Sequence, residues 1–216
     1  MIRGVALDMD GLLFDTERLY WEVGDQLLQR RGQRFCKGLQ QRMMGRVGVS
    51  ALQEMVDFHS LNESAEELLE ESDAIFSQML HHGVEEMPGL SGWISQLVDS
   101  ELPFGLATSS RRKFVNVIFQ SIDWREHLAF VLTGDDVTRG KPDPQIYQLA
   151  AEQMKIDPTE MLVLEDSGNG CAAAVASGAV TVAIPSQHTK DQDFTGAALV
   201  AESLEDPRLW DLIRRA

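Results

Sequence analysis

Gly4-Val-Ala-Leu-Asp-Met-Asp-Gly11 is the stretch of sequence that decides the fold. Its first four residues predict a short buried strand, and two aspartates and a glycine follow where that strand would end. Further apolar strands are predicted at 104–108, 130–132, 161–165 and 180–184, and helices are predicted between and after them at 90–100, 115–121, 146–154 and 172–176. Apolar strands that alternate with helices predict an α/β fold, in which helices cover both faces of a parallel sheet.

The stretch from about Thr16 to Glu86 shows helical patterns only. Its helices are indicated by an apolar stripe (Leu19, Val23 and Leu27) and by two sequences that fit the capping box, Ser50-Ala-Leu-Gln53 and Ser64-Ala-Glu-Glu67. We therefore expect an α/β core of residues 1–16 and 87–216, interrupted after its first strand by an all-helical domain of residues 17–86.

Composition and charge exclude several classes of function. The chain has 216 residues, of which 44% are hydrophobic, enough for a sizeable core. With 34 acidic against 19 basic residues the net charge is −15, which disfavours nucleic acid and anionic membranes as partners. The cysteines, Cys36 and Cys171, form neither a metal motif nor a disulfide framework. No targeting or membrane-spanning segment is visible, so we expect a soluble cytoplasmic protein, and a monomer.

Charge is unevenly distributed in and around the helical stretch. Residues 26–53 contain six basic side chains and no acidic one, whereas residues 54–110 contain twelve acidic side chains and no Lys or Arg. One interpretation is a set of solvated helix faces with opposite charges. The other is that some arginines, Arg46 above all, face an anionic ligand. Arg111, which follows the predicted strand at 104–108, is a second candidate for contact with a substrate.

Four polar clusters lie just beyond predicted strands. They are Asp8-Met-Asp10-Gly11, Thr108-Ser109-Ser110, Gly140-Lys141-Pro-Asp-Pro144 and Glu165-Asp166. Since parallel strands end at one edge of a sheet, the four clusters should converge there. Clustered carboxylates repel one another unless a cation neutralises them, and oxygen ligands without a dedicated loop favour Mg²⁺ over Ca²⁺. The sequence therefore predicts a magnesium site.

The remaining polar groups at this edge suit a phosphate. Hydroxyls and backbone N–H groups between a strand and a helix form an anion site, and Lys141 adds a point charge. A carboxylate beside Mg²⁺ can attack phosphorus and form an aspartyl-phosphate. A second carboxylate two residues away can protonate the leaving oxygen and later activate water.

Taken together, these clusters resemble the four motifs of the haloacid dehalogenase superfamily, in order and spacing. The helical insertion resembles the cap of its β-phosphoglucomutase-like subfamily. The resemblance implies a Rossmann-like core, Mg²⁺ dependence and phosphate-ester chemistry. It assigns Asp8 as nucleophile, Asp10 as general acid/base and as a backbone-carbonyl metal ligand, and Lys141 as the residue that steadies the nucleophile and the phosphoryl group. It further implies phosphate binding by Thr108 and the Ser109 N–H, and metal binding by Asp8 and Asp166, with Glu165 a ligand directly or through water.

Several functions fit parts of this pattern. A dehalogenase is disfavoured because it would not need Asp10, and a non-catalytic phosphate-binding or receiver-like module is disfavoured by the inserted domain. A β-phosphoglucomutase-like phosphotransferase is the serious alternative, but the cap-hinge histidine of that subfamily aligns with Tyr20 here. We therefore expect a Mg²⁺-dependent phosphatase that hydrolyses a small phosphorylated metabolite, with a sugar phosphate the first class to consider and the cap selecting the substrate.

Overall fold

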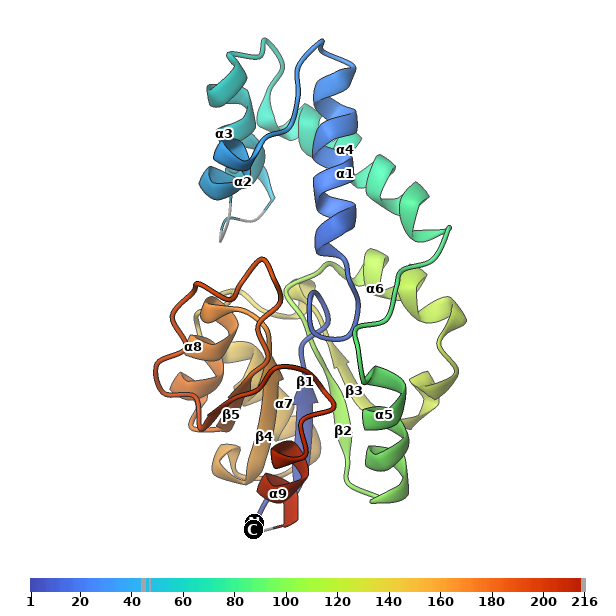
Figure 1. The fold of residues 1–216 in the computed structure, drawn as a ribbon, viewed down its shortest axis with the longest axis vertical. Helices are drawn as coiled ribbons and strands as arrows, with labels where there is room; N and C mark the ends of the chain where they lie inside the picture. Colours follow the sequence, from blue (N-terminus) through green and yellow to red (C-terminus); the bar gives the residue numbers. More distant parts are fainter. Residues whose placement is uncertain (44–45, 47, 215–216) are drawn as a thin grey trace. The chain divides into compact units, whose positions relative to one another are not determined.

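The computed structural model describes residues 1–43, 46 and 48–214 (Figure 1). These residues form two compact units. The first consists of Met1–Asp15 with Val84–Ala216, and the second is the continuous segment Thr16–Gly83.

A single parallel sheet forms the centre of the first unit. Its strands are β1 (Gly4–Leu7), β2 (Phe104–Ala107), β3 (Leu128–Leu132), β4 (Met161–Glu165), β5 (Val180–Ala183) and β6 (Leu199–Val200). Their spatial order is β3-β2-β1-β4-β5-β6, and every neighbouring pair is parallel. The predicted α/β class with a Rossmann-like core is confirmed. Strand β6 was not predicted, and its two residues are not fully buried.

The first strand lies at the point where the strand order changes direction. In β1, Leu7 pairs with Leu106 of β2 on one side and with Leu164 of β4 on the other. Val5, Ala6 and Leu7 are wholly buried because helices cover both faces of the sheet. In sheets of this kind, the carboxyl ends of the strands at such a switch point form the binding crevice.

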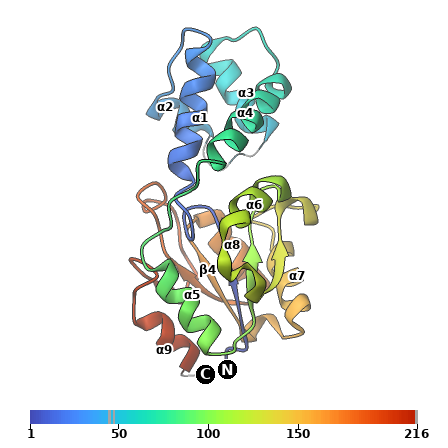
Figure 2. The same ribbon diagram turned by 90° about the vertical axis from the view of Figure 1, so that its right-hand side faces the viewer.

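Five α-helices of the first unit are α5 (Leu90–Asp99), α6 (Arg112–Ile118), α7 (Gln145–Met154), α8 (Gly168–Ser177) and α9 (Arg208–Arg214). Helices α7 and α8 pack against the sheet and against each other, and Figure 2 shows α5 and α9 on the opposite face from α7. Trp93 of α5 contacts Trp210 of α9, with ring centroids 4.6 Å apart. Shorter 3-10 turns are η1 (Phe119–Ser121), η2 (Asp123–His127), η3 (Gly134–Asp136) and η4 (Pro158–Glu160).

Two of these helices differ from the prediction. The helix expected at 115–121 already begins at Arg112, and its last turn is the 3-10 turn η1. The helix expected at 172–176 begins at Gly168, because the Ser167 side chain accepts a hydrogen bond from the Gly170 N–H and caps the first turn.

The second unit is helical throughout its described residues. It contains α1 (Glu17–Gln29), α2 (Lys37–Met43), α3 (Val49–His59) and α4 (Ala65–Leu80). The predicted stripe of Leu19, Val23 and Leu27 is buried. The capping box of Ser64 and Glu67 is present at the start of α4. The one expected at Ser50 is wrong, because α3 already begins at Val49.

The unevenly distributed charges are paired within this second unit. Arg30 and Arg31 form ion pairs with Glu71 of α4, at 2.5 and 2.7 Å, and Arg42 and Arg46 form ion pairs with Glu54 of α3, at 2.8 and 3.0 Å. These pairs tie the basic stretch to the acidic one. Separately, the described helices include none that is both long and apolar enough to cross a bilayer.

Candidate active site

The carboxyl ends of β1 and β4 bring four charged side chains together. Asp8 follows β1, Glu165 ends β4, Asp166 comes next, and Lys141 reaches them from the loop before α7. Carboxylate oxygens of Asp8, Glu165 and Asp166 lie within 4.8 Å of one another. All three residues are at most 5% exposed.

Lys141 is the centre of this cluster. Its ammonium donates hydrogen bonds to Asp8 Oδ1 at 2.5 Å, to Glu165 Oε1 at 2.6 Å and to the Ala107 carbonyl at 3.0 Å. An ammonium has three N–H groups, so these bonds use all of them. Lys141 therefore links the ends of β1, β2 and β4.

Glu165 is surrounded by donors. Oε1 also accepts from the Tyr147 hydroxyl at 2.8 Å, while Oε2 accepts from the Ser167 N–H at 3.1 Å and from its hydroxyl at 3.0 Å. Gly170 makes the space for this carboxylate, since a Cβ at that position would lie 1.7 Å from Glu165 Oε1. The buried charge of Glu165 is thus fully hydrogen-bonded.

Asp10 lies in different surroundings. Its Oδ2 accepts hydrogen bonds from Thr108 Oγ1 at 3.0 Å and from Ser110 Oγ at 2.7 Å. The Ser110 N–H in turn donates to Thr108 Oγ1 at 3.0 Å. Thr108 is buried and Ser109 is exposed. The turn after β2 therefore orients Asp10, which is only partly buried and accepts hydrogen bonds from hydroxyl groups of that turn.

Burial and neighbouring charges change the pKa values of Asp8 and Lys141. Burial, together with the nearby charges of Glu165 and Asp10, raises the pKa of Asp8 to about 7 against the opposing effect of Lys141. Burial disfavours the charge on Lys141, but Asp8 and Glu165 outweigh it and raise the pKa of Lys141 well above its ordinary value. Lys141 thus stays an ammonium, and the cluster carries more negative than positive charge.

This excess of negative charge fits a divalent cation. The oxygens of Asp8 and Asp166 are hard ligands close enough to share one ion. Gly11 keeps the space beside Asp166 open, since a Cβ there would lie 2.5 Å from Oδ2, and its φ of +77° suits glycine. The Thr189 hydroxyl lies 3.4 Å from the same Oδ2.

The two arginine candidates belong to different units. Arg46 is exposed in the helical unit, where its Nη2 pairs with Glu54 and its Nε donates to the Arg42 carbonyl at 3.2 Å. Arg111 precedes α6, with its guanidinium 5.9 Å from the centroid of the Phe114 ring. Their contact with substrate remains a prediction.

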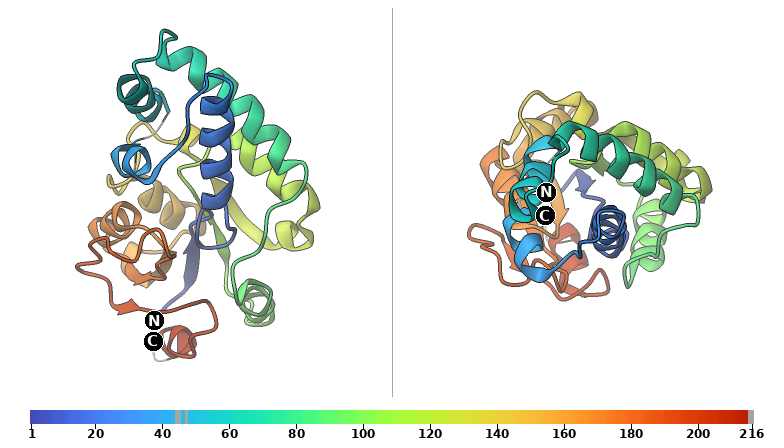
Figure 3. Two further views of the ribbon diagram at one scale, coloured as in Figure 1. Left: turned by 45° about the horizontal axis from the view of Figure 1, so that its top comes forward. Right: turned by 90° about the horizontal axis from the view of Figure 1, so that it is seen from above.

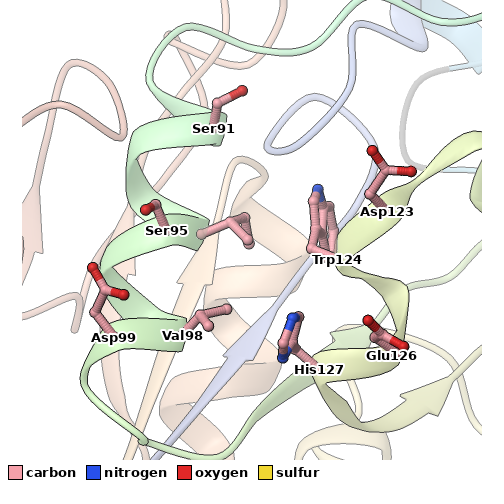
Figure 4. A pocket seen from close by; sticks show the side chains of 9 residues that line it. Ser91, Ser95, Val98, Asp99, Asp123, Trp124, Glu126 and His127 are labelled. Carbon is pink, nitrogen blue, oxygen red and sulfur yellow. The ribbon is translucent and has the colours of Figure 1, made fainter.

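An open pocket lies elsewhere on the first unit. It has a volume of about 450 Å³ and lies between α5 and η2. Figure 4 shows Trp124 and His127 projecting from η2 toward α5. None of the predicted site residues lines it.

Sequence reasoning missed four residues that hold the cluster in place, namely Ser110, Tyr147, Ser167 and Thr189. Ser110 belongs to the recognised cluster after β2, and Ser167 directly follows the cluster of Glu165 and Asp166, so their positions signalled a role. Tyr147 has the spacing of a core residue of α7. Thr189 belongs to the segment between β5 and β6, which Figure 3 draws in orange to red. Only the fold shows that they reach the site.

Known proteins share this fold, and some are similar to this chain in sequence along most of its length. The family model of the haloacid dehalogenase-like hydrolases matches residues 5–184. The chain is 32% identical over 181 residues to the phosphorylated carbohydrates phosphatase of Thermotoga maritima, covering 82% of each protein. It is 33% identical over 223 aligned positions to (DL)-glycerol-3-phosphatase 2 of Arabidopsis thaliana, covering 98% of this chain and 92% of that one. The structure of CbbY from Rhodobacter sphaeroides with xylulose-(1,5)bisphosphate superposes with a TM-score of 0.84 at 21% identity, over 95% of this chain and 96% of that one.

The match to this family model and to these relatives identifies the class of protein as a hydrolase. The chain belongs to the haloacid dehalogenase-like hydrolase family. The expectation of a hydrolase enzyme of this superfamily, drawn from the four motifs, is confirmed.

Proposed function

We propose that this protein is a Mg²⁺-dependent phosphatase that hydrolyses a small phosphomonoester through an aspartyl-phosphate on Asp8. The observation that carries the proposal is the buried cluster in which Lys141 joins Asp8 to Glu165, next to Asp166. Relatives named as phosphatases of phosphorylated carbohydrates and of glycerol-3-phosphate support it, and make sugar and polyol phosphates the first substrates to test.

The residues present suit a magnesium ion. Asp8 and Asp166 would hold it directly with the Asp10 carbonyl, and Glu165, whose oxygens already accept four hydrogen bonds, would reach it through water. When bound, Mg²⁺ would neutralise charge on the phosphoryl oxygens and favour the ionised form of Asp8.

The proposed roles follow from the contacts of each side chain. Asp8 attacks phosphorus while Lys141 offsets the negative charge that gathers between them. Asp10 gives a proton to the leaving oxygen and later takes one from water. The Thr108 hydroxyl orients Asp10, and it lies with the N–H of Ser109, an exposed residue, in the turn proposed to hold the phosphate.

A phosphotransferase of the β-phosphoglucomutase type is the alternative. Such an enzyme must protect its aspartyl-phosphate from water until a sugar rebinds. Tyr20, which stands where that subfamily has a histidine, is 44% exposed and stacks on Phe76 within the helical unit, with ring centroids 4.7 Å apart. A tyrosine has an unperturbed pKa of about 10 and does not titrate as a histidine would near neutral pH, which favours hydrolysis.

The deciding experiment is a substrate screen with the purified protein. Sugar phosphates, glycerol phosphate, phosphoglycolate and nucleotides are offered with Mg²⁺ or with excess chelator, and Asp8→Asn is the inactive control. We expect release of inorganic phosphate that requires both Mg²⁺ and Asp8. Glucose 6-phosphate formed from β-glucose 1-phosphate and a bisphosphate primer, without free phosphate, would favour the phosphotransferase.

A further inference from the structure

Tyr147 lies beneath the charged cluster and contacts it in two ways. Its hydroxyl donates to Glu165 Oε1 at 2.8 Å, and the Lys141 ammonium lies 5.0 Å from the centroid of its ring. The side chain is completely buried. Tyr147 is thus the neighbour of both ends of the Lys141–Glu165 ion pair.

The position of the Tyr147 ring is fixed by the same short segment that carries Lys141, namely the loop before α7 and the first turn of that helix. Tyr147 lies in the first turn of α7, and its N–H donates to the Pro144 carbonyl at 3.0 Å. The loop before α7 is fastened by Gln145, whose Oε1 accepts from the Thr138 and Arg139 N–H groups at 3.0 and 2.9 Å. Ring and ammonium are therefore held at opposite ends of one short, braced loop.

The two carboxylates compete for the same ammonium. Lys141 lies 2.5 Å from Asp8 and 2.6 Å from Glu165, so any change in the attraction of one alters its distance to the other. The Tyr147 hydroxyl donates a second hydrogen bond to Glu165 Oε1 and so weakens the attraction between that oxygen and the Lys141 ammonium. Without it, Glu165 would draw the ammonium away from Asp8.

We propose that Tyr147 is a positioning residue, which shares the Lys141 ammonium between Asp8 and Glu165 by donating its own hydrogen bond to Glu165. This inference rests on the proposed phosphatase function for its kinetic consequence, because there Lys141 must face both Asp8 and the phosphoryl group. Tyr147 acts through Lys141 and does not itself touch substrate.

The kinetic test is Tyr147→Phe, which removes the hydroxyl and keeps the ring. The matched control is Ser177→Ala, which removes another buried hydroxyl, bonded to the Ala174 carbonyl at the far end of α8. We expect Tyr147→Phe to lower kcat about tenfold, which corresponds to about 1.4 kcal/mol of transition-state stabilisation, with KM changed less than twofold. Ser177→Ala should leave both constants within twofold, whatever its effect on Tm.

A second test does not depend on activity. Urea unfolding of Tyr147→Phe, Glu165→Gln and the double variant forms a mutant cycle, and direct contact predicts shifts that are not additive. Additive shifts, or a kcat equal to that of Ser177→Ala in an active protein, would overturn the inference. A wild-type protein that releases no phosphate from any ester, yet shows the coupling, would instead contradict the proposed function and leave the Tyr147–Glu165 contact established.

Discussion

Asp8 and Asp10 are two positions apart in the chain, but they face different partners. Asp8 is buried against the Lys141 ammonium, whereas Asp10 accepts hydrogen bonds from the hydroxyls of Thr108 and Ser110. A carboxylate paired with a cation beside further acids suits a nucleophile. One that accepts hydrogen bonds from two hydroxyl groups suits the general acid/base role proposed for Asp10.

This difference predicts unequal effects of the same substitution. Asp8→Asn should abolish turnover, because no covalent intermediate can form. Asp10→Asn should lower kcat by about 10²–10⁴-fold and leave a measurable trace, since it removes proton transfer alone. Phosphate release and mass spectrometry of trapped aspartyl-phosphate measure both effects. Turnover by Asp8→Asn, combined with an unaffected Asp10→Asn, would show that the roles are assigned wrongly.

Gly170 gives a second prediction at this scale. Alanine normally suits a helix better than glycine, by about 1 kcal/mol. At Gly170, however, the added Cβ would overlap the Glu165 carboxylate, whereas at Gly92 in α5 it would meet no atom within 4 Å. Gly170→Ala should therefore lower both Tm and kcat, whereas Gly92→Ala should leave kcat unchanged and raise Tm slightly. Equal behaviour of the two variants in thermal melts and assays would contradict the tight fit around Glu165.

The sequence predicted the site residues that lie close to the end of a strand and missed others that lie far from one. Asp8, Asp10, Glu165 and Asp166 directly follow or end apolar strands, so their convergence follows from a parallel sheet. Tyr147 had no such signal, because a buried aromatic residue in a helix has the same sequence pattern whether or not its hydroxyl reaches a carboxylate. Such contacts depend on how α7 packs on the sheet, which no local pattern encodes.

Among the elements, strands that are apolar throughout were predicted accurately, whereas the starts of helices were predicted less accurately. The strand predicted at 161–165 matches β4, whose five residues are all buried. Helix starts depended on caps. Ser64 and Ser50 are both followed, three residues later, by a residue that could complete a capping box. Only Ser64 stands before its helix, whereas Ser50 lies inside the first turn of α3, after Gly48. Capping sequences thus mark candidate starts, and packing decides which are used.

The ion pair between Arg31 and Glu71 gives a prediction at this scale. It connects the end of α1 to α4, and the two side chains are only 15% and 25% exposed. Although burial opposes it, hydrogen bonds from Arg31 and Arg30 lower the pKa of Glu71 below its ordinary value of 4.5. A lowered pKa adds stability above about pH 4.5, and this contribution disappears as the pH falls through the folded-state value.

Glu71→Gln should accordingly destabilise the helical unit by about 1 kcal/mol at pH 7 and by much less near pH 3. Glu70→Gln, an exposed position on the same helix, is the matched control. Urea unfolding followed by circular dichroism at the two pH values measures the difference. A loss that is the same at both, or the same in the control, would argue against a stabilising pair.

For the whole molecule, the excess negative charge of the site predicts a response to metal. A cation that binds only the folded state stabilises it by about 2.7 kcal/mol at a concentration 100 times its Kd. Mg²⁺ should therefore raise Tm, and Asp166→Ala should weaken that response. Chelator should abolish phosphate release in the wild type. Full activity in excess chelator would refute the magnesium requirement.

The place of β1 in the sheet has a consequence for how the chain is made. Leu7 leaves the ribosome 157 residues before one of its neighbours in the sheet, Leu164. At ~5–20 residues per second, the interval between them is about 8–30 s. During that time β1 is an apolar segment without its second partner, whereas the helices of Thr16–Gly83 follow one another without interruption. Pulsed hydrogen exchange during refolding should find the amides of α1 and α4 protected before those of β1. Chaperones would then be needed for β1 more than for the helices of Thr16–Gly83.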